Sequence, residues 1–87
     1  MLKILKNIDV SSKMLNFKKD EIAKKMNDNS KMKMKDFLNN ASTIDLYYIC
    51  IIDSYRVRGL KGSIENAKYH FENKKSIEEW KKLVLSK

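Results

Sequence analysis

The 87-residue chain contains no proline, only two glycines and a single cysteine. Proline and glycine interrupt helices, so their scarcity beside abundant Leu, Ile, Lys, Glu and Met predicts helices joined by short turns. Because Cys50 stands alone, a disulfide framework and a paired-cysteine metal site are excluded, which fits a reducing compartment. Its apolar neighbours predict that Cys50 packs in a core and is not a nucleophile, since burial raises a thiol pKa.

Motifs for catalysis and metal binding are also missing. His70 is the only histidine, and no cysteine or second histidine stands at a metal-binding spacing from it. The 11 acidic residues form no recognisable catalytic pair, and the sequence has no glycine-rich phosphate loop. We therefore expect a protein that is not an enzyme and that uses no metal or cofactor.

Long hydrophobic runs are absent as well. The longest apolar block covers about half of the roughly 20 residues that a membrane-spanning helix requires. Residues 1–10 are too short and too charged for a signal peptide, because Lys3, Lys6 and Asp9 interrupt them. The sequence predicts a soluble, cytoplasmic protein without a membrane partner.

Positive charge is the feature that the sequence has in excess. The formal net charge is +8, and residues 1–40 hold ten lysines against five acidic residues. A strongly basic chain favours polyanionic partners such as DNA, RNA or an acidic protein surface. The alternative is that these are ordinary solvated lysines, because AT-rich genomes raise the Lys and Asn content of proteins.

The only long apolar block is residues 44–58, IDLYYICIIDSYRVR. Residues 46–52 are apolar on both alternating faces, as a buried strand would be. The ends of the block favour a helix, because Ser42 or Thr43 can cap its start and Gly59 can take the left-handed conformation that closes it. A strand over residues 44–58 in an α+β fold is the alternative. The predicted helical core face is Ile44, Tyr48, Ile51, Ile52 and Tyr55, widened by Tyr47, Ile49 and Cys50.

Helix-start signals divide the rest of the chain. Ser11 or Ser12 can cap a helix that runs toward Asn27, with Leu15, Ile22, Ala23 and Met26 inward and Lys18, Lys19, Lys24 and Lys25 outward. After a turn at residues 59–62, Ser63 is expected to cap a further helix, and the capping box Ser76-x-x-Glu79 to start the last one, whose inner face is Ile77, Trp80, Leu83 and Val84. Residues 1–10 fit a short helix or an edge strand. The prediction is an all-α fold, a compact bundle of four to five helices in one domain of residues 1–87.

Residues 17–41, FKKDEIAKKMNDNSKMKMKDFLNNA, resemble the helix-turn-helix of DNA-binding regulators. The resemblance depends on the small Ala23 at the crossing point, a polar turn at residues 28–30, and a second helix with Met34, Phe37, Leu38 and Ala41 inward. Asn27 stands where the family usually has glycine, and Met34 comes one position later than the common spacing. A winged version of the fold requires a strand over residues 44–58, with the turn at residues 59–62 as the wing tip.

The resemblance implies that duplex DNA is the partner of a homodimeric regulator or a plasmid or phage accessory protein. Lysine binds phosphate or guanine, and asparagine pairs with adenine. The implied contacts are Ser30, Lys31, Lys33, Lys35, Asn39 and Asn40 on the second helix and Lys24 and Lys25 on the first. Outside the resemblance, Arg56, Arg58 and Lys61 near the later turn are expected to form a compact basic patch that contacts phosphate. The alternative is a basic interaction module, an inhibitor or adaptor, with an acidic protein partner. RNA is a third partner class, although the motifs of common RNA-binding modules are missing.

In so small a domain a single core is only marginally self-sufficient. A homodimer that shares the central apolar block is therefore expected.

Overall fold

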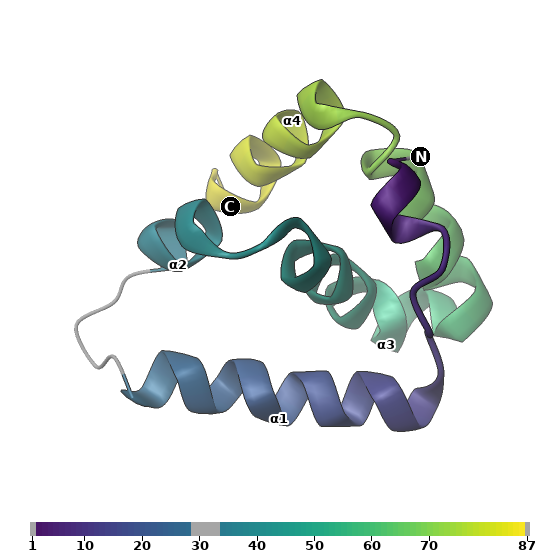
Figure 1. Ribbon diagram of the computed structural model, residues 1–87, viewed down its shortest axis with the longest axis horizontal. Helices are drawn as coiled ribbons and strands as arrows, with labels where there is room; N and C mark the ends of the chain where they lie inside the picture. The colour runs from purple at the N-terminus through teal and green to yellow at the C-terminus, as the bar shows by residue number, and fades with distance from the viewer. Residues whose placement is uncertain (1, 29–33, 87) are drawn as a thin grey trace.

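A computed structural model describes the backbone of residues 2–28 and 34–86 (Figure 1). It contains a short 3-10 helix, η1 (Lys3–Leu5), and the α-helices α1 (Ser12–Asp28), α2 (Met34–Asn40), α3 (Thr43–His70) and α4 (Lys74–Leu85). No strand forms in these two ranges. The predicted all-α bundle is thus confirmed, whereas the strand over residues 44–58 and the winged version that requires it are wrong.

The first half of α3 lies in the middle of the molecule (Figure 1). Along one side of it runs α1, while α2 and α4 lie toward the other side (Figure 1). Five side chains of this half are buried: Leu46, Tyr47, Tyr48, Cys50 and Ile51. Ile44, Ile49 and Ile52 are only partly buried, and Tyr55 is 40% exposed. The predicted core face was incomplete at Leu46, because a helix covered on several sides buries more than one stripe. It was wrong at Tyr55, which is exposed.

Serine caps stabilise the starts of α1 and α3 as predicted. The backbone N–H of Met14 donates to Ser11 Oγ at 3.1 Å, and that of Asp45 donates to Ser42 Oγ at 3.2 Å. Each bond satisfies an amide that has no partner within its own helix. On α1, Leu15 and Ile22 are buried as expected, whereas Ala23 is exposed, which corrects its predicted inward position.

A sharp kink at Gly59 divides α3. Gly59 has φ 74° and ψ −179°, whereas helical residues continue on both sides of it. The Asn66 Nδ2 atom lies 4.0 Å from the Cys50 sulfur, 16 residues away. A straight helix would separate these positions by about 24 Å. The two halves of α3 therefore fold toward one another.

The kink corrects the predicted turn and its cap. One residue changes the direction of the chain instead of the four at 59–62, and Ser63 does not cap a helix. Ser63 is fully buried inside α3, where its hydroxyl donates to the Leu60 carbonyl at 2.9 Å. Ala67, one turn later, is fully buried too. Small buried side chains suit the close approach of the two halves.

Phe71 connects the second half of α3 to two other elements. Its ring centroid lies 5.5 Å from that of Tyr47 and 5.3 Å from that of Trp80 on α4. Its carbonyl accepts a hydrogen bond from the Leu2 backbone N–H at 3.3 Å, which fixes the N-terminal segment here. Within residues 2–10 only η1 is helical, so the predicted helix or edge strand reduces to a single 3-10 turn with Leu5 buried.

The capping box predicted for the last helix is wrong. Asn73, not Ser76, is the N-cap of α4, and its Oδ1 accepts from the Ser76 backbone N–H at 2.8 Å and from the Ser76 hydroxyl at 3.1 Å. Ile77 and Trp80 are buried as predicted, whereas Leu83 is 57% exposed. No described helix is both long and apolar enough to cross a membrane.

Candidate nucleic-acid interface

The short helix α2 presents polar side chains outward and apolar ones inward. Phe37 and Leu38 are buried in the core, whereas Lys35, Asn39 and Asn40 are exposed. Asn40 uses its amide locally, donating from Nδ2 to the Asp36 carbonyl at 2.9 Å. Lys35 and Asn39 therefore stand one turn apart on the open face of α2.

Of the other sequence predictions about the second helix, one is wrong and the rest lie outside the described residues. Met34, expected inward, is the first residue of α2 and is 49% exposed. Ser30, Lys31 and Lys33, together with most of the predicted turn at residues 28–30, lie outside the described residues.

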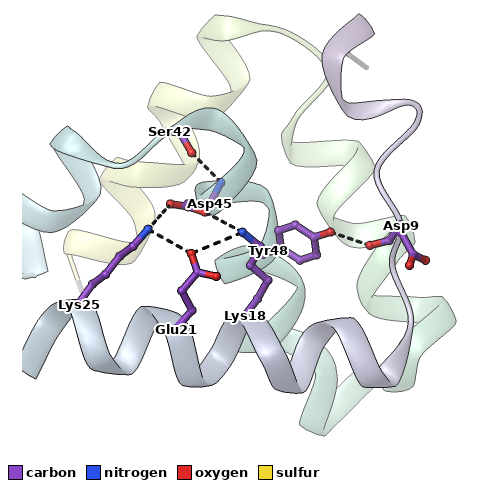
Figure 2. A network of polar contacts seen from close by, with 7 residues as sticks. All are labelled: Asp9, Lys18, Glu21, Lys25, Ser42, Asp45 and Tyr48. Atoms are coloured by element: carbon purple, nitrogen blue, oxygen red, sulfur yellow. Dashed lines mark hydrogen bonds and ion pairs between the residues drawn. The ribbon is translucent and has the colours of Figure 1, made fainter.

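On α1, the basic side chains point to different sides of the helix. Lys18 and Lys25 face the start of α3 and form the ion-pair network with Glu21 and Asp45 (Figure 2). Lys25 Nζ lies 3.3 Å from Glu21 Oε1 and 3.4 Å from Asp45 Oδ2, and Lys18 Nζ lies 3.5 Å from Asp45 Oδ1. The prediction that Lys18 faces outward is wrong, because only 16% of its side chain is exposed.

The ion-pair network neutralises this flank of α1. The hydrogen bond to Glu21 and then the Asp45 charge raise the pKa of Lys25. Lys18 Nζ also lies 5.4 Å from the centroid of the Tyr48 ring, whose hydroxyl donates to the Asp9 carbonyl at 2.6 Å (Figure 2). Two acidic groups here balance two lysines, so Lys25 is a poorer candidate for phosphate than the exposed Lys24 beside it.

The three basic residues near the kink lie on both sides of it. Arg56 and Arg58 precede Gly59 and Lys61 follows it, and all three are exposed. None of them forms an ion pair with another described residue. Arg58 affects His70, whose pKa is lowered first by burial and then by the Arg58 charge.

A cleft between α1 and α3 contains positive charge that the sequence did not reveal. We call it the basic cleft; it has a volume of about 390 Å³ and is lined by Ser12, Leu15, Asn16, Lys19, Ile52, Tyr55 and Arg56. None of these residues is acidic. The hydroxyls of Ser12 and Tyr55 lie 3.4 Å apart across the cleft. Four of its polar residues, Ser12, Asn16, Lys19 and Tyr55, were not among the predicted contacts, because they meet only when α1 packs on α3.

A second hollow adjoins the basic cleft and shares Lys19 and Ile52 with it. This apolar groove has a volume of about 250 Å³ between α1, α2 and α3. Its apolar lining is Ile22, Ala23, Met34, Phe37, Ile49 and Ile52, and Lys19 and Asp53 also line it. Ala23 of α1 and Met34 and Phe37 of α2 therefore border the same space.

Two further features concern the thiol of Cys50 and the residue types that bind metal ions. Burial, and then the charge of Asp53, raise the pKa of the Cys50 thiol to about 12, so it is protonated at neutral pH. Among the described residues, no three His, Cys, Asp or Glu side chains are grouped so that they could hold a metal ion.

Comparisons with protein-family models, with curated proteins and with solved structures found no match to this chain.

Proposed function

We propose that the protein is a nucleic-acid-binding module that binds duplex DNA through the outward face of α2. The observation that carries this proposal is the two-sided character of α2, in which Phe37 and Leu38 are buried while Lys35 and Asn39 are exposed. A helix that enters the major groove needs both properties, because the core must hold it firmly while polar side chains reach the base edges.

Each exposed residue has a distinct role in this proposal. Asn39 pairs through its side-chain amide with adenine, and Lys35 binds phosphate or a guanine edge. Basic residues outside the ion-pair network, including Lys24, Arg56 and Lys61, add affinity by releasing counterions from the phosphate backbone. These contributions separate cleanly, because base contacts determine sequence preference and phosphate contacts determine salt dependence.

The test is binding to duplex DNA by fluorescence anisotropy over a salt series. The probes are a random duplex, the region upstream of the protein's own gene, and a duplex selected from a random library for tight binding. The double variant K35A/N39A is expected to lose preference for the favoured duplex, at about 1–3 kcal/mol for each base contact. The matched control, N7A/K68A, removes the same residue types from exposed positions elsewhere.

The outcomes separate clearly. Sequence preference that disappears in K35A/N39A but persists in the control supports the proposal. Equal, weak binding of all duplexes that vanishes with salt, or a K35A/N39A variant that keeps its preference, contradicts it. An RNA duplex of the same sequence, added as a competitor, tests the preference for DNA.

The homodimer belongs to this proposal, since a dimer recognises two half-sites about 34 Å apart. The apolar block expected to join two chains is largely buried within one chain, at Leu46, Tyr47, Tyr48, Cys50 and Ile51. A dimer therefore has to use other surfaces, and large apolar side chains are exposed at Ile4, Phe17, Val57, Tyr69 and Leu83. Sedimentation equilibrium with and without DNA measures the mass directly.

A second candidate function is a basic interaction module with an acidic protein partner. The apolar groove favours it, because Met34 is half-exposed there beside Ala23 and Ile52, and exposed apolar surface marks protein interfaces. In this case the protein binds no nucleic acid at moderate salt and co-purifies with its partner in a fixed ratio. Binding that survives Met34→Lys would contradict a role for the groove.

A further inference from the structure

We infer that the basic cleft between α1 and α3 binds a phosphate group of a nucleic-acid backbone. The inference rests on the proposed function and deepens it, because it adds a second contact surface away from the exposed face of α2. Lys19 from α1 and Arg56 from α3 line the same cleft. Two cations on separate helices that border one hollow are arranged to act together on one anionic group.

The neutral groups of the basic cleft are also hydrogen-bond donors. The hydroxyls of Ser12 and Tyr55 form a hydrogen bond of 3.4 Å, which leaves one of their two protons to donate elsewhere, and the side-chain amide of Asn16 lines the same space. A phosphodiester carries only acceptor oxygens, so a cleft lined by hydroxyl, amide, ammonium and guanidinium donors matches its chemistry. The residues that the structure shows lining the cleft include no Asp or Glu that would compete with a phosphate for these donors.

The basic cleft keeps its positive charge because Lys19, which lines it, is not in the ion-pair network, unlike its neighbour Lys18. Lys18 is paired with Asp45 in the ion-pair network, whereas the next residue, Lys19, forms no ion pair with any other described residue. Arg56 likewise has no ion-pair partner among them. Positive charge is thus cancelled on one flank of α1 and left available on the other, and the start of α1 adds the positive end of a helix dipole beside Ser12.

The volume and the apolar lining of the basic cleft favour a segment of nucleic-acid backbone over a single small ion. A volume of about 390 Å³ falls within the range of pockets that hold small organic ligands. Leu15 and Ile52 add apolar surface that suits a sugar ring next to the phosphate. The bound group is therefore a phosphodiester with its neighbouring sugar.

The experiment compares two double variants that lose the same amount of charge. K19Q/R56Q removes both cations of the basic cleft, and K13Q/K68Q removes two exposed lysines outside it. Each protein is titrated with inorganic phosphate, a short dinucleotide, an acidic peptide and duplex DNA while backbone amide signals are followed by NMR, and duplex affinity is measured over a salt series.

The dinucleotide is expected to shift the amides of Ser12, Asn16, Lys19 and Arg56 in the wild type and not in K19Q/R56Q. The slope of log affinity against log salt for duplex DNA should fall by about 0.9 in that variant, because both cations act on one phosphate and roughly 0.9 is lost for each phosphate contact. The control K13Q/K68Q should keep the shifts and most of the slope. Shifts that respond to inorganic phosphate as strongly as to the dinucleotide overturn the assignment to a backbone segment.

Failure of this inference differs from failure of the proposed function. Equal losses of salt slope in the two double variants, or amide shifts outside the basic cleft, overturn the inference that the cleft binds a phosphodiester. The K35A/N39A test of α2 is not affected by either result. Dinucleotide shifts in the cleft without any duplex binding retain the phosphodiester site and overturn the duplex-DNA proposal. Cleft shifts that only an acidic peptide produces overturn the inference and favour the protein-interaction alternative.

Discussion

Gly59 determines the course of α3. Its φ of 74° combines with a ψ of −179°, a region that glycine alone populates freely, and not with the smaller positive ψ of the left-handed conformation that closes helices. A Cβ atom added at Gly59 would meet no heavy atom within 4 Å. The requirement for glycine therefore comes from the backbone itself and not from crowding by neighbours.

Replacing Gly59 with alanine should destabilise the protein by about 1–3 kcal/mol through this backbone strain. Gly59→Asn should cost a similar amount, although asparagine often replaces glycine in the left-handed conformation. Urea unfolding followed by Trp80 fluorescence gives both values. Val57→Ala, a change at a residue that is 87% exposed, is the control and should stay within about 0.5 kcal/mol of the wild type. Full stability of Gly59→Asn would contradict the observed ψ.

Cys50 illustrates how burial controls reactivity. Its side chain is 1% exposed and the pKa of its thiol rises from 9.0 to about 12. At pH 8 this lowers the thiolate fraction by about a thousandfold relative to the unfolded chain, and burial also restricts access of reagents. Alkylation by iodoacetamide should therefore be slower in the folded protein than in concentrated urea by a factor of about that order. Comparable rates in the two conditions would show that Cys50 is accessible.

Among the elements, the helix starts were predictable wherever a short polar side chain directly precedes an amphipathic segment. Ser11 and Ser42 satisfy this rule, since each accepts from a backbone amide three residues later. The start of α4 was missed because the sequence offers two caps close together, and the motif at Ser76 and Glu79 is the more familiar one. Asn73 prevails because a helix that starts three residues earlier gains almost a full turn of backbone hydrogen bonds.

The N-cap of α4 gives a prediction at this scale. Asn73→Ala removes the acceptor of two hydrogen bonds from Ser76 and should destabilise the protein by about 1 kcal/mol. Ser76→Ala removes only the hydroxyl and leaves the backbone bond, so its effect should be smaller. Urea unfolding of the two variants provides the comparison. A larger loss in Ser76→Ala would restore the capping box as the start of the helix.

The candidate site shows where prediction from sequence stops. Exposure of Lys35 and Asn39 followed from the amphipathic spacing of α2, a property of one element. The pairing of Lys25 with Asp45 in the ion-pair network could not be predicted from the sequence. Asp45 is 20 residues away and contacts Lys25 only after α1 packs on α3. The basic cleft depends on the same packing. Contacts between helices distant in sequence carry no local signal, so charge alone could not distinguish Lys18 from Lys19.

At the scale of the whole molecule, one aromatic side chain joins the parts of the fold. Phe71 is fully buried, with rings from both the first half of α3 and from α4 beside it, and its carbonyl receives the Leu2 amide. A protein of 87 residues typically has a free energy of unfolding of about 4–13 kcal/mol. Removing a buried phenylalanine side chain costs about 3–5 kcal/mol. Truncation of the Phe71 side chain alone should therefore remove a large part of the free energy of unfolding.

Phe71→Ala should leave a substantial fraction of the molecules unfolded at 37 °C, and Phe71→Leu, which keeps most of the apolar volume, should lose less. Thermal unfolding by circular dichroism and by Trp80 fluorescence measures both variants, and the two signals should coincide because Tyr47, Phe71 and Trp80 belong to one core.

Tyr69→Ala is the matched control, since this neighbouring aromatic side chain is 69% exposed and its loss should change the free energy of unfolding by no more than about 0.5 kcal/mol. Equal effects of Tyr69→Ala and Phe71→Ala would contradict the placement of Phe71 at the centre. Separate transitions in the two signals would show that α4 unfolds independently of the rest of the bundle.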